Sequence, residues 1–206
     1  MINPRRFLIR IVVPLLMVGC GAGCGSNGEL EPDVQGSPSP DVTQEAEVLI
    51  PSAGVISQWG ESAEASSEFA NPEWSASQAV GIPDAPGCGD YQFAWASAGS
   101  DAIETLEVVF RSQVYPLEIF IHQSFNPDQV VKVEVLNAET GAYYTVHQKN
   151  PIQVDRPCPF ILEVVVKGID FKTGQIRITV DQSQLGLGWN EIDAVQLVGS
   201  FSIEEQ

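Results

Sequence analysis

Short stretches in which apolar and polar residues alternate recur along most of this chain, and they constrain its fold more than any other feature. They lie at 104–110, 117–123, 129–148, 160–168, 174–182 and 191–199. A period of two places successive side chains on opposite faces of a β-strand. The stretch 129–148 divides into two strands around a turn at 137–141. Because no helices separate the strands, the pattern predicts an all-β fold, an antiparallel two-sheet β-sandwich, rather than a parallel α/β sheet.

One short helix is predicted before the first of these strands, in "NPEWSASQAVG". Asn71 is a favourable N-cap, and Pro72 would occupy the first helical position. Glu73 suits the positive end of the helix dipole, and Gly81 suits the position after the helix. Such a helix has about two turns and depends on packing rather than on propensity.

The N-terminus has the layout of a secretory signal peptide. "MINPRRFLIR" supplies positive charge and "IVVPLLMV" is an apolar run, far shorter than the roughly 20 residues that span a membrane. The run 17–20, "MVGC", resembles a bacterial lipobox, which implies that residues 1–19 are removed and that Cys20 is lipidated. Cys24 is the weaker alternative, and ordinary cleavage near Gly21 or Ala22 is another.

The segment 20–52 is rich in Gly, Ser, Pro and acidic residues, and it contains neither a basic nor an aromatic residue. This composition predicts a disordered, self-repelling tether. The folded domain is expected over 53–206. Together these features predict a lipid-anchored protein of the cell envelope, extracytoplasmic, at the outer membrane or the cell surface.

The formal net charge of −17 limits the partners of this chain. Three of the ten basic residues precede residue 11, and the remaining seven face 27 acidic residues. Such a surface repels phosphate backbones and anionic lipid head groups, so nucleic acid is not an expected partner and the membrane is reached through the lipid anchor only. Neutral ligands and divalent cations remain compatible with this charge.

Two cysteines, Cys88 and Cys158, lie in the expected domain. Two lone cysteines in an oxidising compartment tend to pair, so a disulfide is predicted. Two free thiols are an alternative. A metal–thiolate site is another, although neither cysteine has further Cys or His residues nearby.

The last strand carries two carboxyl groups on its expected buried face. Counting back by twos from Leu197 and Val195 reaches Asp193 and Glu191. A buried carboxylate needs a proton, hydrogen-bond donors or a cation.

Three blocks of the sequence resemble a known family. "EASSEFANPEWSASQAVGIPDAPGCGDYQFAWAS", "VYPLEIFIHQSFNPDQVVKVEVL" and "WNEIDAVQLVG" are similar to discoidin-like (F5/8 type C-like) galactose-binding-type β-sandwich modules, with a jelly-roll fold. The resemblance covers about 63–199 and extends to modules that recur in bacterial extracytoplasmic proteins. It implies the sandwich fold, whose members bind sugars, lipids or proteins, or support a neighbouring enzyme.

The resemblance also implies a structural calcium ion. In many members an acid in the loop before a tryptophan-bearing strand and an acid on the last strand bind the metal, which corresponds here to Asp84 or Asp90 together with Glu191. The "DG" loop of those calcium binders is absent. The alternative is that Glu191 and Asp193 accept hydrogen bonds from N–H groups and fasten the loops.

Aromatic residues gather in the loop-rich beginning of the domain and before the last strand. Trp74 and Trp95 are expected in the core, which is where aromatic side chains most often lie. Tyr91 and Trp189 are the candidates for a ligand-binding surface, and Asn190 could hydrogen-bond a ligand hydroxyl.

The expected function is a non-catalytic module that binds carbohydrate or another cell-envelope component. His122 and His147 each lie on an expected strand, and no motif of a nucleophilic, metal-dependent or nucleotide-binding enzyme is present. The alternative is a structural or interaction domain that contacts a protein partner through the same loops.

Overall fold

The computed structural model describes residues 54–154 and 158–203, all within the unit Val48–Gln206. The predicted signal peptide, Cys20 and the tether lie outside the described residues. Within the described part, no helix is long and apolar enough to cross a membrane. The elements in chain order are β1 (Val55–Trp59), β2 (Ser62–Ala65), the 3₁₀ helix η1 (Ala76–Ala79), β3 (Ile103–Phe125), β4 (Val130–Leu136), β5 (Tyr143–Gln148), β6 (Phe160–Val165), β7 (Thr173–Asp181) and β8 (Glu191–Ser200).

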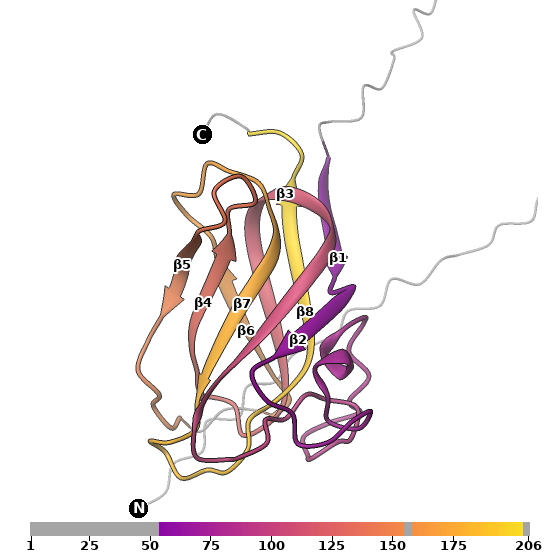
Figure 1. Cartoon of the computed structure of the whole chain (residues 1–206), viewed down its shortest axis with the longest axis vertical. Coiled ribbons are helices and arrows are strands. Elements are labelled where there is room, and N and C mark those ends of the chain that lie inside the picture. Colours follow the sequence, from indigo (N-terminus) through magenta and orange to yellow (C-terminus); the bar gives the residue numbers. More distant parts are fainter. Residues whose placement is uncertain (1–53, 155–157, 204–206) are drawn as a thin grey trace, which may run out of the picture. The chain divides into compact units, whose positions relative to one another are not determined.

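The strands form the predicted antiparallel sandwich, and β3 belongs to both of its layers (Figure 1). The first half of β3 pairs with β2 and β7, and β4 and β5 continue that layer. The second half of β3 pairs with β6 and β8 in the second layer, and β1 extends this layer by pairing with β8. The register of β3 against β7 shifts between Val109 and Val114, where the strand bends from one layer to the other. The two strands predicted at 104–110 and 117–123 are therefore the two halves of one bent strand.

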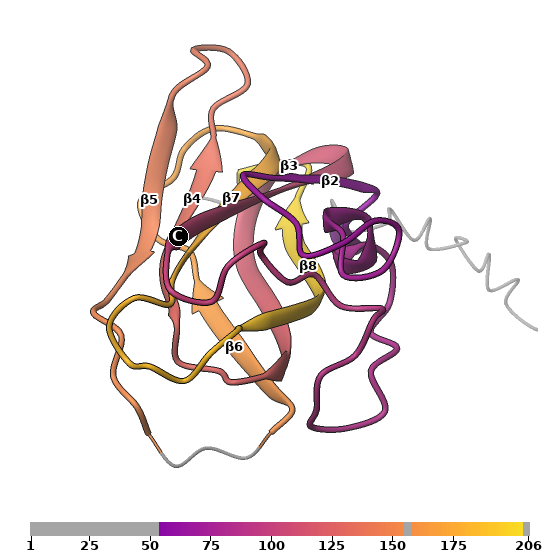
Figure 2. The same cartoon turned by 60° about the horizontal axis from the view of Figure 1, so that its bottom comes forward.

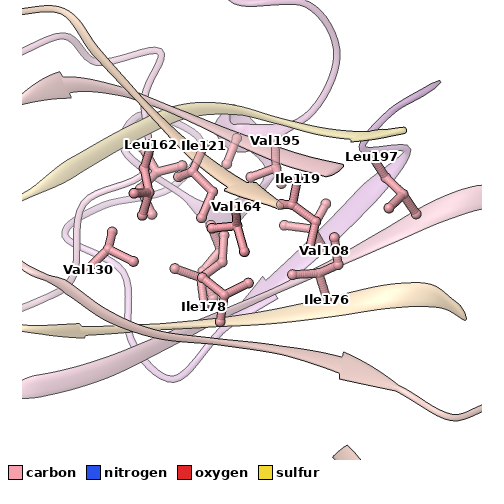
Figure 3. Close-up of a cluster of buried hydrophobic side chains, with 14 of the residues drawn as sticks. Val108, Ile119, Ile121, Val130, Leu162, Val164, Ile176, Ile178, Val195 and Leu197 are labelled. Carbon is pink, nitrogen blue, oxygen red and sulfur yellow. The ribbon is translucent and has the colours of Figure 1, made fainter. Parts of the chain in front are cut away.

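The alternating apolar residues of both layers fill the space between them (Figure 3). Ile176 and Ile178 on β7 face Ile119 and Ile121 on β3, and all four are fully buried. Opposing apolar side chains that interdigitate in this way are the main stabilising contribution in a sandwich.

β1 and β2 were not predicted from the sequence, and a glycine between them makes their arrangement possible. β1 lies in one layer and β2 in the other. A Cβ atom on Gly60 would lie 2.6 Å from Val108 Cγ1, so only glycine fits where the chain crosses between the layers.

The predicted two-turn helix at 71–81 is wrong. The structure has only the 3₁₀ helix η1 there, and Ser75 rather than Asn71 precedes it. Trp74 has a φ of +53°, in the left-handed region that a right-handed helix excludes. Tertiary hydrogen bonds hold this conformation, from Trp74 N to Gln92 O at 2.9 Å and from Ala96 N to Trp74 O at 3.1 Å.

Three connections, two of them long, meet at one end of the sandwich, which faces the viewer in Figure 2. They are the segments 66–102, 126–129 and 182–190. We refer to them together as the loop end. The side chain of Asn126 joins two of them, because its Nδ2 donates to Leu187 O at 2.7 Å and to Trp189 O at 3.0 Å.

Candidate functional site

A disulfide fastens the loop end. Cys88 and Cys158 are bonded, with their Cα atoms 4.9 Å apart, as the cysteine count predicts. Cys158 Sγ lies 3.1 Å from the carbonyl oxygen of Ser124, and the same oxygen accepts a hydrogen bond from Gly89 N at 2.9 Å. The loop that carries Cys88 is therefore held against both the end of β3 and the segment before β6.

The carboxyl group of Glu191 is buried at the start of β8, with 2% of the residue exposed. Its Oε2 accepts hydrogen bonds from Tyr91 N at 3.0 Å and from Ser124 Oγ at 3.2 Å. Burial, the largest cause, and the neighbouring Asp90 carboxyl raise the pKa of Glu191 to about 8, against the opposing effect of the Tyr91 N–H. The raised pKa favours the protonated form of Glu191, hydrogen-bonded to Asp90.

Asp193 is the second buried carboxyl group of β8, with 4% of the residue exposed. Its Oδ1 accepts hydrogen bonds from the backbone N of Asp84 and of Ala85, both at 3.3 Å. Burial is again the largest cause, and together with the Asp84 carboxyl it raises the pKa of Asp193 to about 6, while the two N–H donors act in the opposite direction. Each buried carboxyl of β8 thus faces one carboxyl of the loop 84–91.

The three predicted calcium ligands do not form one cluster. Asp90 lies beside Glu191, whereas Asp84 lies beside Asp193. Over residues 54–154 and 158–203, no group of three Asp, Glu, His or Cys side chains is arranged to hold a metal ion. Within the predicted set, Glu191 and Asp90 are a pair that lies side by side. The observed N–H and hydroxyl donors match the alternative role, in which Glu191 and Asp193 fasten the loops.

Three aromatic side chains pack together at the surface of the loop end, and we call Phe69, Trp74 and Trp189 the aromatic cluster. The Phe69 ring lies 5.3 Å from the Trp74 ring and 5.5 Å from the Trp189 ring, edge to face in both cases. Phe69 is 50% exposed and the two tryptophans are half-buried. The cluster therefore presents aromatic surface to the solvent.

The indole N–H groups of the aromatic cluster are used inside the protein. Trp74 Nε1 donates to Asp90 Oδ1, and Trp189 Nε1 donates to the backbone oxygen of Ser97, both at 2.9 Å. Beneath them Trp95 is fully buried, and its Nε1 donates to Ser67 O at 3.1 Å. Each indole is thus held in one orientation, and a ligand would meet ring surface rather than a free indole N–H.

The predicted ligand residues are not all part of this surface. Trp189 belongs to the aromatic cluster. Tyr91 is half-buried and stacks on Phe93 at 5.2 Å, and its ring closely covers Gly89. The proposal that Asn190 bonds a ligand is wrong, because Asn190 is fully buried.

Asn190 instead holds the neighbouring strands and loops together. Its Nδ2 donates to Gln123 Oε1 at 2.9 Å and to Asn126 O at 3.1 Å. Its backbone N donates to Gln182 Oε1 at 2.8 Å. This buried amide network holds the segment that carries Trp189, and within the described residues the Asn190 Oδ1 atom has no hydrogen-bond partner.

The sequence did not identify Phe69 as the exposed centre of the aromatic cluster. Its only local signal was a large aromatic residue in a loop of Ser, Glu, Asn and Pro residues. Trp74, which was expected in the core, is half-buried, whereas Trp95 is in the core as expected.

A cavity of about 380 Å³ lies away from the loop end, between β1 and the bend of β3. An exposed ion pair, Arg111 to Glu61 at 3.1 Å, stands at this cavity. Gln58 closes its inner side by bonding both the N and the O of Ser112, at 3.0 and 2.8 Å. These contacts pair the side chains of Gln58, Glu61 and Arg111 with groups of the protein itself.

Comparison with known proteins identifies both the family and the fold. The family model described as Pappalysin-1, SD scarf domain, C-terminal, matches residues 50–204. A search of curated proteins finds no match.

Three solved structures share the fold. A chitosan-binding module of a chitosanase/glucanase from Paenibacillus sp. IK-5 is 15% identical, with a TM-score of 0.51 over 66% of this chain and 92% of that one. A fucolectin from the serum of striped bass, Morone saxatilis, is 12% identical, with a TM-score of 0.51 over 68% of this chain and 49% of that one. A chain of the complex of reduced XRCC1 with the DNA pol beta catalytic domain is 12% identical, with a TM-score of 0.53 over 70% of this chain and 97% of that one. The predicted galactose-binding-like, discoidin-type fold is confirmed.

Proposed function

The chain belongs to the family described as Pappalysin-1, SD scarf domain, C-terminal, and from that premise we propose that it is a non-catalytic module that binds carbohydrate at its aromatic cluster. The exposure of Phe69 between two oriented tryptophans carries this proposal. An aromatic face offers a flat apolar surface on which the apolar face of a sugar ring can stack, and binding residues concentrate on loops that a rigid scaffold holds.

The scaffold under the aromatic cluster favours binding because little has to be ordered when a ligand arrives. The indole hydrogen bonds of Trp74 and Trp189 fix both rings, and the disulfide fixes the adjoining loop. Rigid aromatic groups lose little conformational entropy on binding, which leaves more of the contact energy as affinity. Two proteins with the same fold are a chitosan-binding module and a fucolectin, which supports carbohydrate as the ligand class.

A protein partner is the second candidate, and exposed aliphatic side chains in two connecting segments, one of them part of the loop end, favour it. Ile82 in the segment 66–102 is 70% exposed. Ile152, in the segment that precedes the disulfide-bonded Cys158, is 63% exposed. Apolar side chains that face the solvent are typical of protein interfaces when they form one continuous patch.

We further propose that the protein is held at the cell envelope by a lipid on Cys20, on the extracytoplasmic side. The support is the sequence alone, because the basic and apolar N-terminus is followed by "MVGC". A tether of the composition of 20–52 would let the loop end reach ligands away from the membrane.

A glycan array tests the proposed function. The full chain carrying Cys20→Ser, which removes the predicted lipid, would be applied to immobilised neutral, acidic and amino-sugar oligosaccharides. Binding to one group of glycans is the expected result. Absence of binding to every glycan, together with capture of a protein partner that Ile82→Ser abolishes, would replace this function with the second candidate.

A further inference from the structure

Resting on the proposed function, we propose that the aromatic cluster selects glycans that carry protonated amino sugars, and that Asp90 is the residue that sets this preference. A 2-amino-2-deoxy sugar with a free amine combines an apolar ring face, which stacks on aromatic rings, with an ammonium group, which is attracted by carboxylates and by aromatic faces. The structure presents partners for both parts of such a sugar side by side.

All the charged residues of the loop end are acidic. The segments 66–102, 126–129 and 182–190 contain no Lys, Arg or His. Their acidic residues are Glu68, Glu73, Asp84, Asp90, Asp101 and Asp128. A surface with this sign attracts cations, repels sialylated or sulfated glycans and gives neutral glycans no electrostatic contribution.

The basic residues of the described chain lie outside these three segments. Four of them lie on or next to β4, β6 and β7, namely Lys132, Lys167, Lys172 and Arg177. Lys149 follows β5, and Arg111 lies at the bend of β3. Arg177 and Arg111 are paired with carboxylates of their own, at 2.7 and 3.1 Å. None of them belongs to the segments that form the aromatic cluster.

Asp90 brings this negative charge to the aromatic rings. Its Oδ1 accepts the hydrogen bond of Trp74 Nε1 at 2.9 Å, so the carboxyl group lies at the edge of the Trp74 ring, and the residue is exposed. An ammonium group that contacts Asp90 would therefore stand beside the ring on which its sugar stacks.

Glu68 and Glu73 add negative charge next to two members of the aromatic cluster. Glu68 immediately precedes Phe69, and its Oε1 is held by Ala76 N at 2.7 Å. Glu73 is exposed and immediately precedes Trp74. Charged and aromatic residues thus alternate along the same short segment.

The test compares two oligosaccharides of equal length and linkage, one of glucosamine and one of N-acetylglucosamine, by calorimetric titration into the full chain carrying Cys20→Ser at low salt and mildly acidic pH. The glucosamine oligomer should bind about threefold to fivefold more tightly, which is the upper range for one exposed charge pair. The preference should shrink as salt is added, because exposed charges are screened. Equal binding of the two oligomers would overturn the inference and leave the proposed function standing, whereas the absence of binding to any glycan would remove both.

Asp90→Asn isolates the charge, because asparagine retains an oxygen that can accept the Trp74 Nε1 hydrogen bond. This variant should bind the N-acetylated oligomer as the unmodified chain does and should lose the preference for the amine. Glu139→Gln, at the exposed turn between β4 and β5, makes the same change in net charge and should keep the preference. If Asp90→Asn does not fold, Glu73→Gln takes its place and should reduce the preference. An unchanged preference in the folded variant, or tighter binding of an oligolysine peptide than of the glucosamine oligomer, would contradict the inference.

Discussion

Phe69 packs edge to face on Trp189 with ring centroids 5.5 Å apart, although Phe69 precedes β3 and Trp189 precedes β8. The contact joins the first long loop of the domain to the last one. Trp189 is also held by two hydrogen bonds, because its Nε1 donates to Ser97 O in the first loop and its backbone oxygen accepts from Asn126 Nδ2. The surface that we propose to bind carbohydrate is therefore a product of tertiary structure.

Reduction of the disulfide should destabilise the domain. Cys88 and Cys158 are 70 positions apart, and closing a loop of that length stabilises the folded state by about 4 kcal/mol in the simple entropic model. For a domain of this size the melting temperature should fall by roughly 10 °C. The measurement is calorimetry of the unmodified chain and of Cys88→Ser/Cys158→Ser. Two native thiols that react with an alkylating agent before any reductant is added would show that the bond does not form.

Glu191 should make the stability of the domain depend on pH in a definite direction. Its pKa is raised from 4.5 to about 8 in the folded state, so the folded state binds the proton more tightly than the unfolded state. Its contribution is complete below pH 4.5 and is lost as the pH rises toward 8. Glu191→Gln, which imitates the protonated group, should melt on the order of 5 °C above the unmodified chain at pH 8 in the absence of metal ions.

This difference should vanish below pH 4.5, where Glu191 is protonated in both the folded and the unfolded state. Thermal melts of the two chains across this range are the measurement. A variant that is less stable at every pH would show that the negative charge, rather than the proton, is what the folded state requires.

Calcium, which the family resemblance predicts, would reverse the dependence of the domain's stability on pH that Glu191 causes. A cation held by Glu191 and Asp90 would take the place of the shared proton, so calcium should raise the melting temperature more at pH 8 than at pH 5. Binding to the native state alone adds about 2.7 kcal/mol when free ion exceeds its dissociation constant a hundredfold. That corresponds to roughly 5–11 °C, which a chelator should remove.

Glu191→Gln is the matched control for calcium and should show no ion-dependent shift. Elemental analysis of the purified chain provides the independent check. If neither calcium nor chelator changes the melting temperature and no metal is found, Glu191 and Asp193 act only as hydrogen-bonded supports of the loop 84–91.

The lipid anchor is tested by fractionation of cells that express the full chain. The unmodified protein should partition into detergent, whereas Cys20→Ser should be released or remain as an unprocessed precursor. Cys24→Ser should behave as the unmodified protein does. The opposite pattern for the two variants would assign the lipid to Cys24.

Local patterns in the sequence were sufficient for most of the sandwich. Alternation located β7 and β8 to within one residue at each end and placed Glu191 and Asp193 on the buried face that they occupy. The number and spacing of cysteines were sufficient for the disulfide, since two candidates allow one pairing. Each of these features depends on the identity of nearby residues or on a count.

The features that the sequence did not reveal depend on distant partners. The sequence favoured Asn190 as a ligand-binding residue, and only its distant partners, Gln123 on β3 and Gln182 just after β7, make it a buried support. The capping pattern at Asn71 predicted a helix, but tertiary hydrogen bonds hold Trp74 in a left-handed conformation. Phe69 belongs to the aromatic cluster only because the fold brings Trp74, from later in the same segment, and Trp189, from the segment before β8, beside it.

The central claim is that the exposed ring of Phe69 binds sugar, and calorimetric titration of Phe69→Ala with the glycan identified on the array tests it most directly. Phe201→Ala is the matched control, because Phe201 is 46% exposed, close to the 50% of Phe69, and follows β8 outside the loop end. The account predicts that Phe69→Ala weakens binding at least about tenfold, or about 1.4 kcal/mol, with a melting temperature within a few degrees of the unmodified chain. Phe201→Ala should leave the affinity unchanged. Full affinity in a folded Phe69→Ala protein would contradict the account.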